Sequence, residues 1–162
     1  RNGIDDRQLL RISVKESIET LLERNHVKSE EVHRILAVGM VSSEFGLCNL
    51  EPIMAPAGIQ ELHDTMYETV LSDITTIPFV FIRGVKIKGE CEEETDVMRG
   101  EETELMGIMK DTRCVYILPG SHSKIIRADE QGRIASFFSS FCAAMWIRYS
   151  SAAENRSRKQ CR

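Results

Sequence analysis

The spacing of hydrophobic positions changes several times along the chain, and each change marks an expected element. Residues 5–25 repeat apolar side chains at helical spacing. The apolar face of this predicted helix consists of Leu10, Val14, Ile18, Leu21 and Leu22. Asp5 and Asp6 suit its N-terminal end, and Asn25 and His26 suit its C-terminal end.

Three short apolar runs predict buried strands at residues 34–40, 77–82 and 114–118. Each run is too short for most helices and is rich in strand-forming side chains. The first run follows the helix after a brief turn at residues 29–31. A helix, a short turn and an apolar strand in this order favour an α/β fold.

The segments between these strands are assigned from periodicity and charge. Residues 57–71 have the spacing of an amphipathic helix, and His63 and Asp64 are expected on its solvated side. Residues 86–96 are polar and acidic, which predicts a solvent-exposed loop and a candidate flap. After Lys124, the pattern indicates strands at 125–126 and 134–138 around a turn at 129–132. Residues 139–162 have no regular hydrophobic periodicity, which predicts a disordered tail.

Composition narrows the class of protein. The chain has 162 residues, enough for one domain with a core, and its 42% hydrophobic and 28% charged residues are ordinary for a soluble protein. A net charge of −4 gives no basic face for nucleic acid, and no apolar stretch reaches membrane-spanning length. Five cysteines without C-x-x-C pairing favour reduced thiols in the cytoplasm over disulfides or a zinc site. Because the chain begins at Arg1 inside a helical pattern, a fragment is expected.

A first candidate cluster opens a short helix that carries Leu105, Met106 and Met109. Glu101 and Glu102 follow Arg99 and Gly100, so two carboxylates lie beside a cation and a glycine that permits close approach. Such a group suits hydroxyl activation and anion binding. The alternative is that both acids complement the positive end of the helix, worth about 0.3–1 kcal/mol each.

Two further segments carry polar groups at strand ends. Gly120, Ser121, His122 and Lys124 form a turn whose N–H groups, hydroxyl and amine suit phosphate oxygens, although a plain tight hairpin has the same pattern. Ser42 and Ser43 directly follow a predicted strand, where ligands of open α/β sheets are found. Their alternative role is to cap the next turn. The spacing of a P-loop, a protein-kinase catalytic loop or a metalloprotease motif is absent from the sequence.

The segment from Val97 to Lys124, with MRGEET, an apolar strand and LPGSHSK, resembles the 2-keto-3-deoxygalactonokinase (2-dehydro-3-deoxygalactonokinase) family. The AVGMVSS segment at 37–43, Gly46 and the APAG segment at 55–58 are similar to that family in the same order, so the resemblance covers about residues 30–138. It implies a fragment of a two-lobed sugar kinase with the actin/hexokinase-like (ribonuclease H-like) fold. Expected boundaries are 1–98 for the later part of the first lobe, 99–138 for the hinge-side helix and first hairpins of the second lobe, and 139–162 for an unassigned tail.

The resemblance further implies phosphorylation of the 6-hydroxyl of 2-dehydro-3-deoxy-galactonate, with ATP and Mg²⁺, in sugar-acid catabolism. Glu101 is then the expected base, while Arg99 is expected to bind the sugar-acid carboxylate or the transferring phosphate. Ser42, Ser43 and Glu102 are expected to shape the sugar pocket. Gly120, Ser121, His122 and Lys124 are expected to contact ATP phosphates.

The sequence also departs from the resemblance. An Asp-x-Gly-Thr-type phosphate loop and a late Gly-Thr-Ser element are missing, so this fragment is expected to be inactive. Two alternatives remain open: a non-catalytic sugar-acid-binding remnant, and an unrelated α/β hydrolase using Glu101 and His122. The sequence does not indicate an oligomeric state.

Overall fold

The computed structural model describes residues 5–88, 95–120 and 122–140. Helix α1 (Asp6–Asn25) confirms the first predicted helix, and His26, with a left-handed backbone (φ 54°), ends it. Leu10, Val14 and Ile18 pack against the neighbouring core as expected. Leu21 differs from the prediction because it is 63% exposed, whereas the adjacent Leu22 is partly buried.

Sheet A has the strand order β1-β4-β3 and combines parallel and antiparallel pairing. Strands β1 (Ile35–Ala37) and β4 (Phe79–Phe81) are parallel, whereas β3 (Tyr67–Thr69) is antiparallel to β4. The predicted buried strand at 77–82 is confirmed in the central strand β4, whose three residues are buried. The run at 34–40 is shorter and less buried than predicted, because β1 lies at the sheet edge and a 3₁₀ turn, Gly39–Ser42, follows it.

The predicted helix at 57–71 is wrong beyond its first turns. Helix α2 covers Ile59–Asp64, and the chain then extends into β3. Pairing of β3 with the buried strand β4 outweighs the helical periodicity of this segment. Exposed His63 and Asp64 agree with the expected solvated side.

Sheet B joins β2 (Ile53–Met54), β5 (Val85–Ile87) and β6 (Asp96–Met98), with β5 in the centre. Both ends of the expected acidic loop at 86–96 are therefore strand residues, in β5 and in β6. The centre of that loop, 89–94, lies outside the described residues. Helix α3 (Glu101–Met106) follows β6 after two residues, and its Leu105 is fully buried.

Sheet C is the expected antiparallel meander of β7 (Cys114–Leu118), β8 (Ser123–Ala128) and β9 (Ile134–Ser140). Strand β7 is confirmed as a strand but not as a buried one, because it forms a sheet edge and Val115 and Ile117 are 61% and 65% exposed. Residues 139 and 140, assigned to the tail from sequence, continue β9. The rest of that predicted tail lies outside the described residues.

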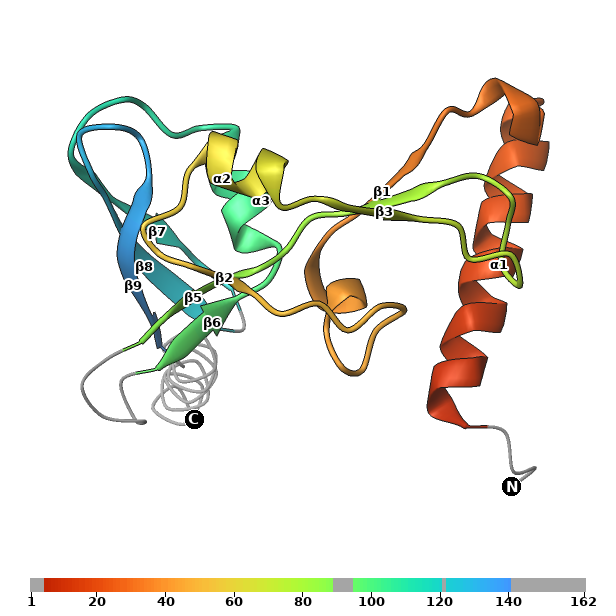
Figure 1. Ribbon diagram of the computed structural model, residues 1–162, viewed down its shortest axis with the longest axis horizontal. Helices are drawn as coiled ribbons and strands as arrows, with labels where there is room; N and C mark the ends of the chain where they lie inside the picture. The colour runs from red at the N-terminus through yellow and green to blue at the C-terminus, as the bar shows by residue number, and fades with distance from the viewer. Residues whose placement is uncertain (1–4, 89–94, 121, 141–162) are drawn as a thin grey trace, which may run out of the picture.

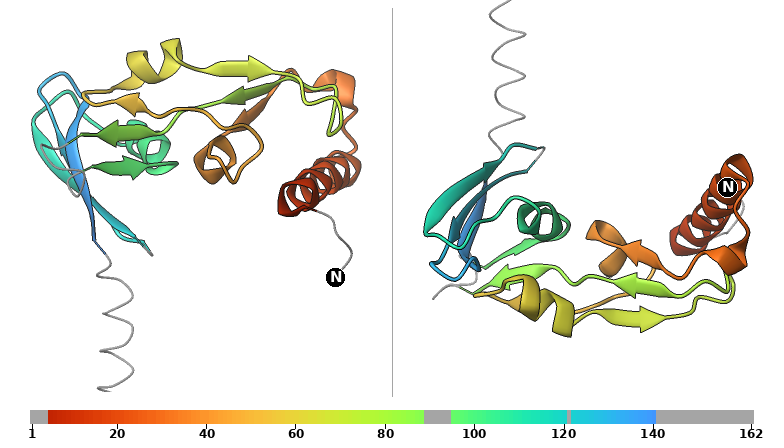
Figure 2. Two further views of the ribbon diagram at one scale, coloured as in Figure 1. Left: turned by 60° about the horizontal axis from the view of Figure 1, so that its bottom comes forward. Right: turned by 90° about the horizontal axis from the view of Figure 1, so that it is seen from above.

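Two hydrophobic cores hold these elements. The N-terminal core consists of Ala37, Leu47, Leu50, Ile74, Phe79 and Phe81. The C-terminal core consists of Ala57, Leu62, Ile82, Val85, Met98, Leu105, Ile126, Ile134 and Phe137. Figure 1 shows α1 at one end of an elongated molecule and β7–β9 at the other, with extended segments running between them. Figure 2 shows the same arrangement from two further sides. Core membership alone does not define lobes, so the expected boundary at residues 98–99 stays a prediction.

Candidate functional site

Two glycines with left-handed backbone face each other where the turn after β1 meets the end of β6. Gly39 has φ 82° and Gly100 has φ 109°. A Cβ added to Gly100 would lie 3.4 Å from the Gly39 Cα, and one added to Gly39 would lie 3.6 Å from the Arg99 carbonyl oxygen. Glycine permits both the backbone conformation and this close approach. The two expected clusters at 39–43 and 99–102 therefore lie side by side.

Arg99 ties these segments together through its guanidinium group. Its Nη1 donates to the Ser42 carbonyl oxygen (3.0 Å) and to Ser42 Oγ (3.3 Å). Nη1 and Nη2 both donate to the Leu50 carbonyl oxygen at 3.3 Å. Because these bonds join residues 49 and 57 positions apart, Arg99 fixes the loop between β1 and β2 against the start of α3.

The Arg99 guanidinium has N–H groups that these bonds do not use. Guanidinium has five N–H groups, and the bonds to Leu50 use the edge shared by Nη1 and Nη2. The opposite edge, formed by Nε–H and the outer Nη2–H, makes no hydrogen bond within the described part of the chain. Such an edge can bind a carboxylate through two parallel bonds.

Glu101 and Glu102 have different surroundings although they are adjacent. Glu101 is half-buried, and its Oε2 accepts the Arg99 backbone N–H at 3.0 Å. Glu102 is completely buried, and both of its oxygens accept the Gly100 N–H at 2.8 Å. Burial raises the pKa of the Glu102 carboxyl to about 7, despite the opposing effect of the Gly100 hydrogen bond. Glu102 thus does not reach the surface where the sequence placed a sugar contact.

Ser42 and Ser43 are buried and bond to the turn that contains them. Ser42 Oγ donates to the Gly39 carbonyl oxygen (2.9 Å), and Ser43 Oγ donates to the Met40 carbonyl oxygen (2.7 Å). These contacts match the capping role that the sequence left open. Ser42 differs from Ser43 because it also contacts Arg99.

The second expected cluster lies at the β7–β8 turn, beside the start of β6. Gly120 and His122 are exposed, whereas Ser121 lies outside the described residues. Lys124 is 4% exposed, and its Nζ donates to the Val97 carbonyl oxygen (2.9 Å), to Asp96 Oδ1 (3.4 Å) and to Ser139 Oγ. An ammonium group has three N–H donors, so these partners use all of them. The amine therefore braces β6, β8 and β9 instead of facing the turn.

Several residues of this arrangement were missed from sequence. Gly39 permits the backbone approach, and its place in the family-like AVGMVSS segment was a signal for it. Leu50 contributes a carbonyl oxygen, which a sequence does not distinguish from any other. Asp96 belongs to an acidic run, and the sequence does not predict its contact with Lys124.

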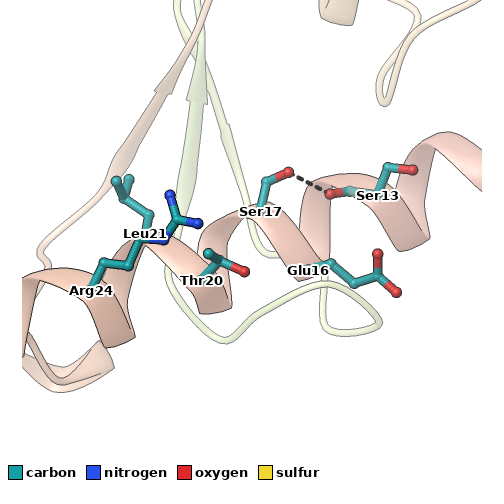
Figure 3. A pocket seen from close by; sticks show the side chains of 6 residues that line it. All are labelled: Ser13, Glu16, Ser17, Thr20, Leu21 and Arg24. Carbon is teal, nitrogen blue, oxygen red and sulfur yellow. Dashed lines mark hydrogen bonds between the residues drawn. The ribbon is translucent and has the colours of Figure 1, made fainter.

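Four surface hollows formed by described residues lie away from both clusters. One of about 480 Å³ lies along α1 and is lined by Ser13, Glu16, Ser17, Thr20, Leu21 and Arg24. Figure 3 shows these side chains projecting from one helix, with Ser17 Oγ bonded to the Ser13 carbonyl oxygen. Because a single helix supplies every lining residue, this hollow is a surface depression, and it contains none of the expected site residues.

The described residues contain no group of three or more His, Cys, Asp or Glu side chains arranged to hold a metal ion. None of the helices in that part of the chain is long and apolar enough to cross a bilayer.

Comparisons with known proteins give a consistent result. The sequence model of the 2-keto-3-deoxy-galactonokinase family matches residues 6–146. A crystal structure of a Sinorhizobium meliloti protein, provisionally named a 2-dehydro-3-deoxygalactonokinase, has a similar fold, with a TM-score of 0.68 and 21% sequence identity. The match covers 82% of this chain and 42% of that one, so this chain spans less than half of the other protein's length. No curated protein sequence matches the chain.

Proposed function

Because the chain belongs to the 2-keto-3-deoxy-galactonokinase family, we propose that it forms the acceptor side of a sugar-acid kinase. The reaction transfers a phosphoryl group from ATP to the 6-hydroxyl of 2-dehydro-3-deoxy-galactonate. The observation that carries the proposal is the junction of Arg99, Ser42 and Leu50, which brings the two family-like segments together beside Glu101. Phosphoryl transfer depends mainly on positioning and charge stabilisation, and this junction supplies both.

Glu101 is the carboxylate that acts on the acceptor hydroxyl. It is half-buried, whereas Glu102 is completely buried, and its bond from the Arg99 N–H limits its rotation. A carboxylate in this place accepts the hydroxyl hydrogen bond and directs the oxygen toward the phosphoryl group. Proton transfer by such a group typically contributes about 10²–10⁴ in rate.

Arg99 binds the carboxylate of the sugar acid through its remaining guanidinium edge. The same side chain fixes the loop at 42–50, so ligand binding and loop position depend on one residue. Ser42 and Ser43 act through the shape of that loop and not by direct contact, because both hydroxyls bond to their own turn.

The β7–β8 turn is assigned to the phosphate groups of ATP, through Gly120, Ser121 and His122. Lys124 supports this turn from below, since its three donors are used on β6 and β9. Magnesium in kinases is bound by phosphates and one or two carboxylates. The described residues contain no group of three or more His, Cys, Asp or Glu side chains that could hold the ion, so ATP phosphates would have to supply most of its ligands.

The proposal is tested by calorimetric titration of the 162-residue chain with 2-dehydro-3-deoxy-galactonate. We expect measurable binding that Arg99→Lys weakens at least about tenfold, because a point charge replaces a two-bond edge. Arg83→Lys is the matched control, since Arg83 also bonds to two backbone carbonyl oxygens, those of Thr65 and Glu51, and so anchors the chain next to Leu50 without a proposed ligand contact. Equal loss in both variants would contradict a ligand contact at Arg99.

The same titration separates this proposal from its alternatives. ATP with magnesium should neither bind with micromolar affinity nor be turned over by this chain alone, because positioning requires a complete donor site. Turnover of an ester without ATP would favour the hydrolase alternative. Sugar-acid binding that persists when the chain is joined to a complete donor lobe, but without turnover, would favour the non-catalytic remnant.

A further inference from the structure

Glu102 is a completely buried carboxylate that takes part in no salt bridge within the described residues. Burying a charged group is costly unless hydrogen bonds or an opposite charge compensate it. The charged groups nearest to it are Glu101 and Arg99, and the Arg99 guanidinium points to Ser42 and Leu50 instead. Its hydrogen-bond donors among these residues are backbone N–H groups: that of Gly100, shared between both oxygens, and its own. A feature that costs stability in this way calls for a role other than folding.

The bond between the Gly100 N–H and the Glu102 carboxylate fixes Gly100, the residue on which the junction depends. Gly100 has a left-handed backbone and touches Gly39, and its carbonyl oxygen accepts the N–H groups of Thr103 (3.0 Å) and Glu104 (3.2 Å). With Glu102 on its N–H, Gly100 is held from both sides. Arg99 and Glu101 are its immediate neighbours, so the direction of both side chains follows from the orientation of this one residue.

We propose that Glu102 is a positioning residue: by holding the Gly100 N–H, its buried carboxylate directs Arg99 and Glu101 toward the sugar acid without contacting it. The assignment of Arg99 and Glu101 to the sugar acid rests on the function proposed above. The bond from Gly100 to Glu102, and its effect on the two neighbours, do not depend on it.

Two simpler roles fit the geometry less well. A carboxylate that complements a helix end would be exposed to solvent, as Glu104 is on the same helix. A catalytic base must lie within hydrogen-bond reach of the substrate proton, and a completely buried carboxylate does not.

The first test uses nuclear magnetic resonance of the 162-residue chain, without ligand, between pH 5 and pH 9. The Gly100 amide signal should titrate with a midpoint near pH 7 as Glu102 ionises. Glu102→Gln should abolish this titration and shift the Arg99 Nε–H signal, while Glu104→Gln changes neither. A Gly100 amide that does not titrate, or an Arg99 signal that is the same with and without Glu102, would overturn the proposal.

The second test measures sugar-acid affinity at pH 6 and pH 8. The wild-type chain should bind more tightly at pH 8, where Glu102 is ionised. Glu102→Gln should weaken sugar-acid binding about tenfold at pH 8 and should bind equally well at pH 6 and pH 8. Glu102→Asp should restore part of the affinity and part of its pH dependence. If Glu102→Gln binds as the wild type does, Glu102 does not position the ligand groups. If the wild type itself fails to bind, the proposed function fails, and the resonance test alone decides whether Glu102 directs its neighbours.

Discussion

The two hydrophobic cores differ in how completely they are enclosed. In the C-terminal core, Val85, Met98, Leu105, Ile126 and Ile134 are completely buried, because α3 and sheets B and C surround them. In the N-terminal core, Phe79 and Phe81 of β4 are buried, but the neighbouring β1 and the loop after it leave Leu36 63% and Phe45 75% exposed. The C-terminal core therefore has the packing of a finished interior, whereas the N-terminal core has one well-covered strand.

This difference shows what the junction at Arg99 contributes. The loop at 42–50 belongs to the less enclosed region, and the start of α3 belongs to the better enclosed one. Arg99, beside the start of α3, bonds to the loop at 42–50, and Gly39 and Gly100 permit this contact. A loop that would otherwise depend on a small core is thus held by a residue anchored beside a larger one. The proposed ligand groups lie at this boundary.

The largest effect that separates the regions should come from removing a core side chain. Ile126→Ala should lower the free energy of unfolding by about 2–5 kcal/mol, since Ile126 is completely buried between β7 and β9. Leu36→Ala, a truncation of the same kind on the exposed edge strand β1, should cost less than about 1 kcal/mol. Urea unfolding of both variants measures the contrast. Equal losses would mean that β1 is as well covered as β8.

A second prediction concerns the pH dependence of stability. The Glu102 carboxyl has a pKa of about 7 in the folded chain against 4.5 as its ordinary value. Between these values the unfolded chain has released the proton and the folded chain still holds it, so raising the pH favours the unfolded state. The difference corresponds to about 3 kcal/mol of stability, present below pH 4.5 and lost by about pH 7.

Urea unfolding at several pH values between 4 and 8 measures this loss. Glu102→Gln, which has no proton to exchange, should flatten the part of the curve between pH 4.5 and pH 7. Glu104→Gln is the control, because Glu104 is exposed on the same helix, and it should keep the slope. A wild-type curve that rises across this window would show that burial does not raise the pKa of Glu102 in the folded chain.

The sequence predicted elements well where local pattern and tertiary contacts agree. Helix α1, the central strand β4 and the meander of sheet C all have periodicity that their neighbours reinforce. The predicted helix at 57–71 failed because residues 67–69 are held by β4, a partner ten or more positions away. Burial of β1 and β7 was overestimated for a similar reason: an apolar run does not show whether a strand is central or at an edge.

The candidate site was predictable as residues but not as contacts. The MRGEET and AVGMVSS segments identified the family, which the match over residues 6–146 confirms. The sequence could not distinguish Glu101 from Glu102, because two adjacent acids at a helix start have the same pattern until one is buried. It could not place the Lys124 amine either, since its partners Asp96, Val97 and Ser139 come from two other strands.

The smallest predicted effect distinguishes the two serines of the loop. Ser42 and Ser43 are both buried and each donates to its own turn, so either change to alanine should cost about 0.5–1.5 kcal/mol. Ser42 Oγ also accepts a hydrogen bond from Arg99, whereas Ser43 has no contact with that side chain. Combined with Arg99→Lys, Ser42→Ala should therefore show a coupling energy of at least about 0.5 kcal/mol, and Ser43→Ala should be additive within about 0.3 kcal/mol. Unfolding free energies of the single and double variants give both values. If Ser43 couples to Arg99 as strongly as Ser42 does, Arg99 acts on the whole turn and not through the Ser42 hydroxyl. The junction would then be held by the close backbone contact of Gly39 and Gly100 and not by the bond to Ser42.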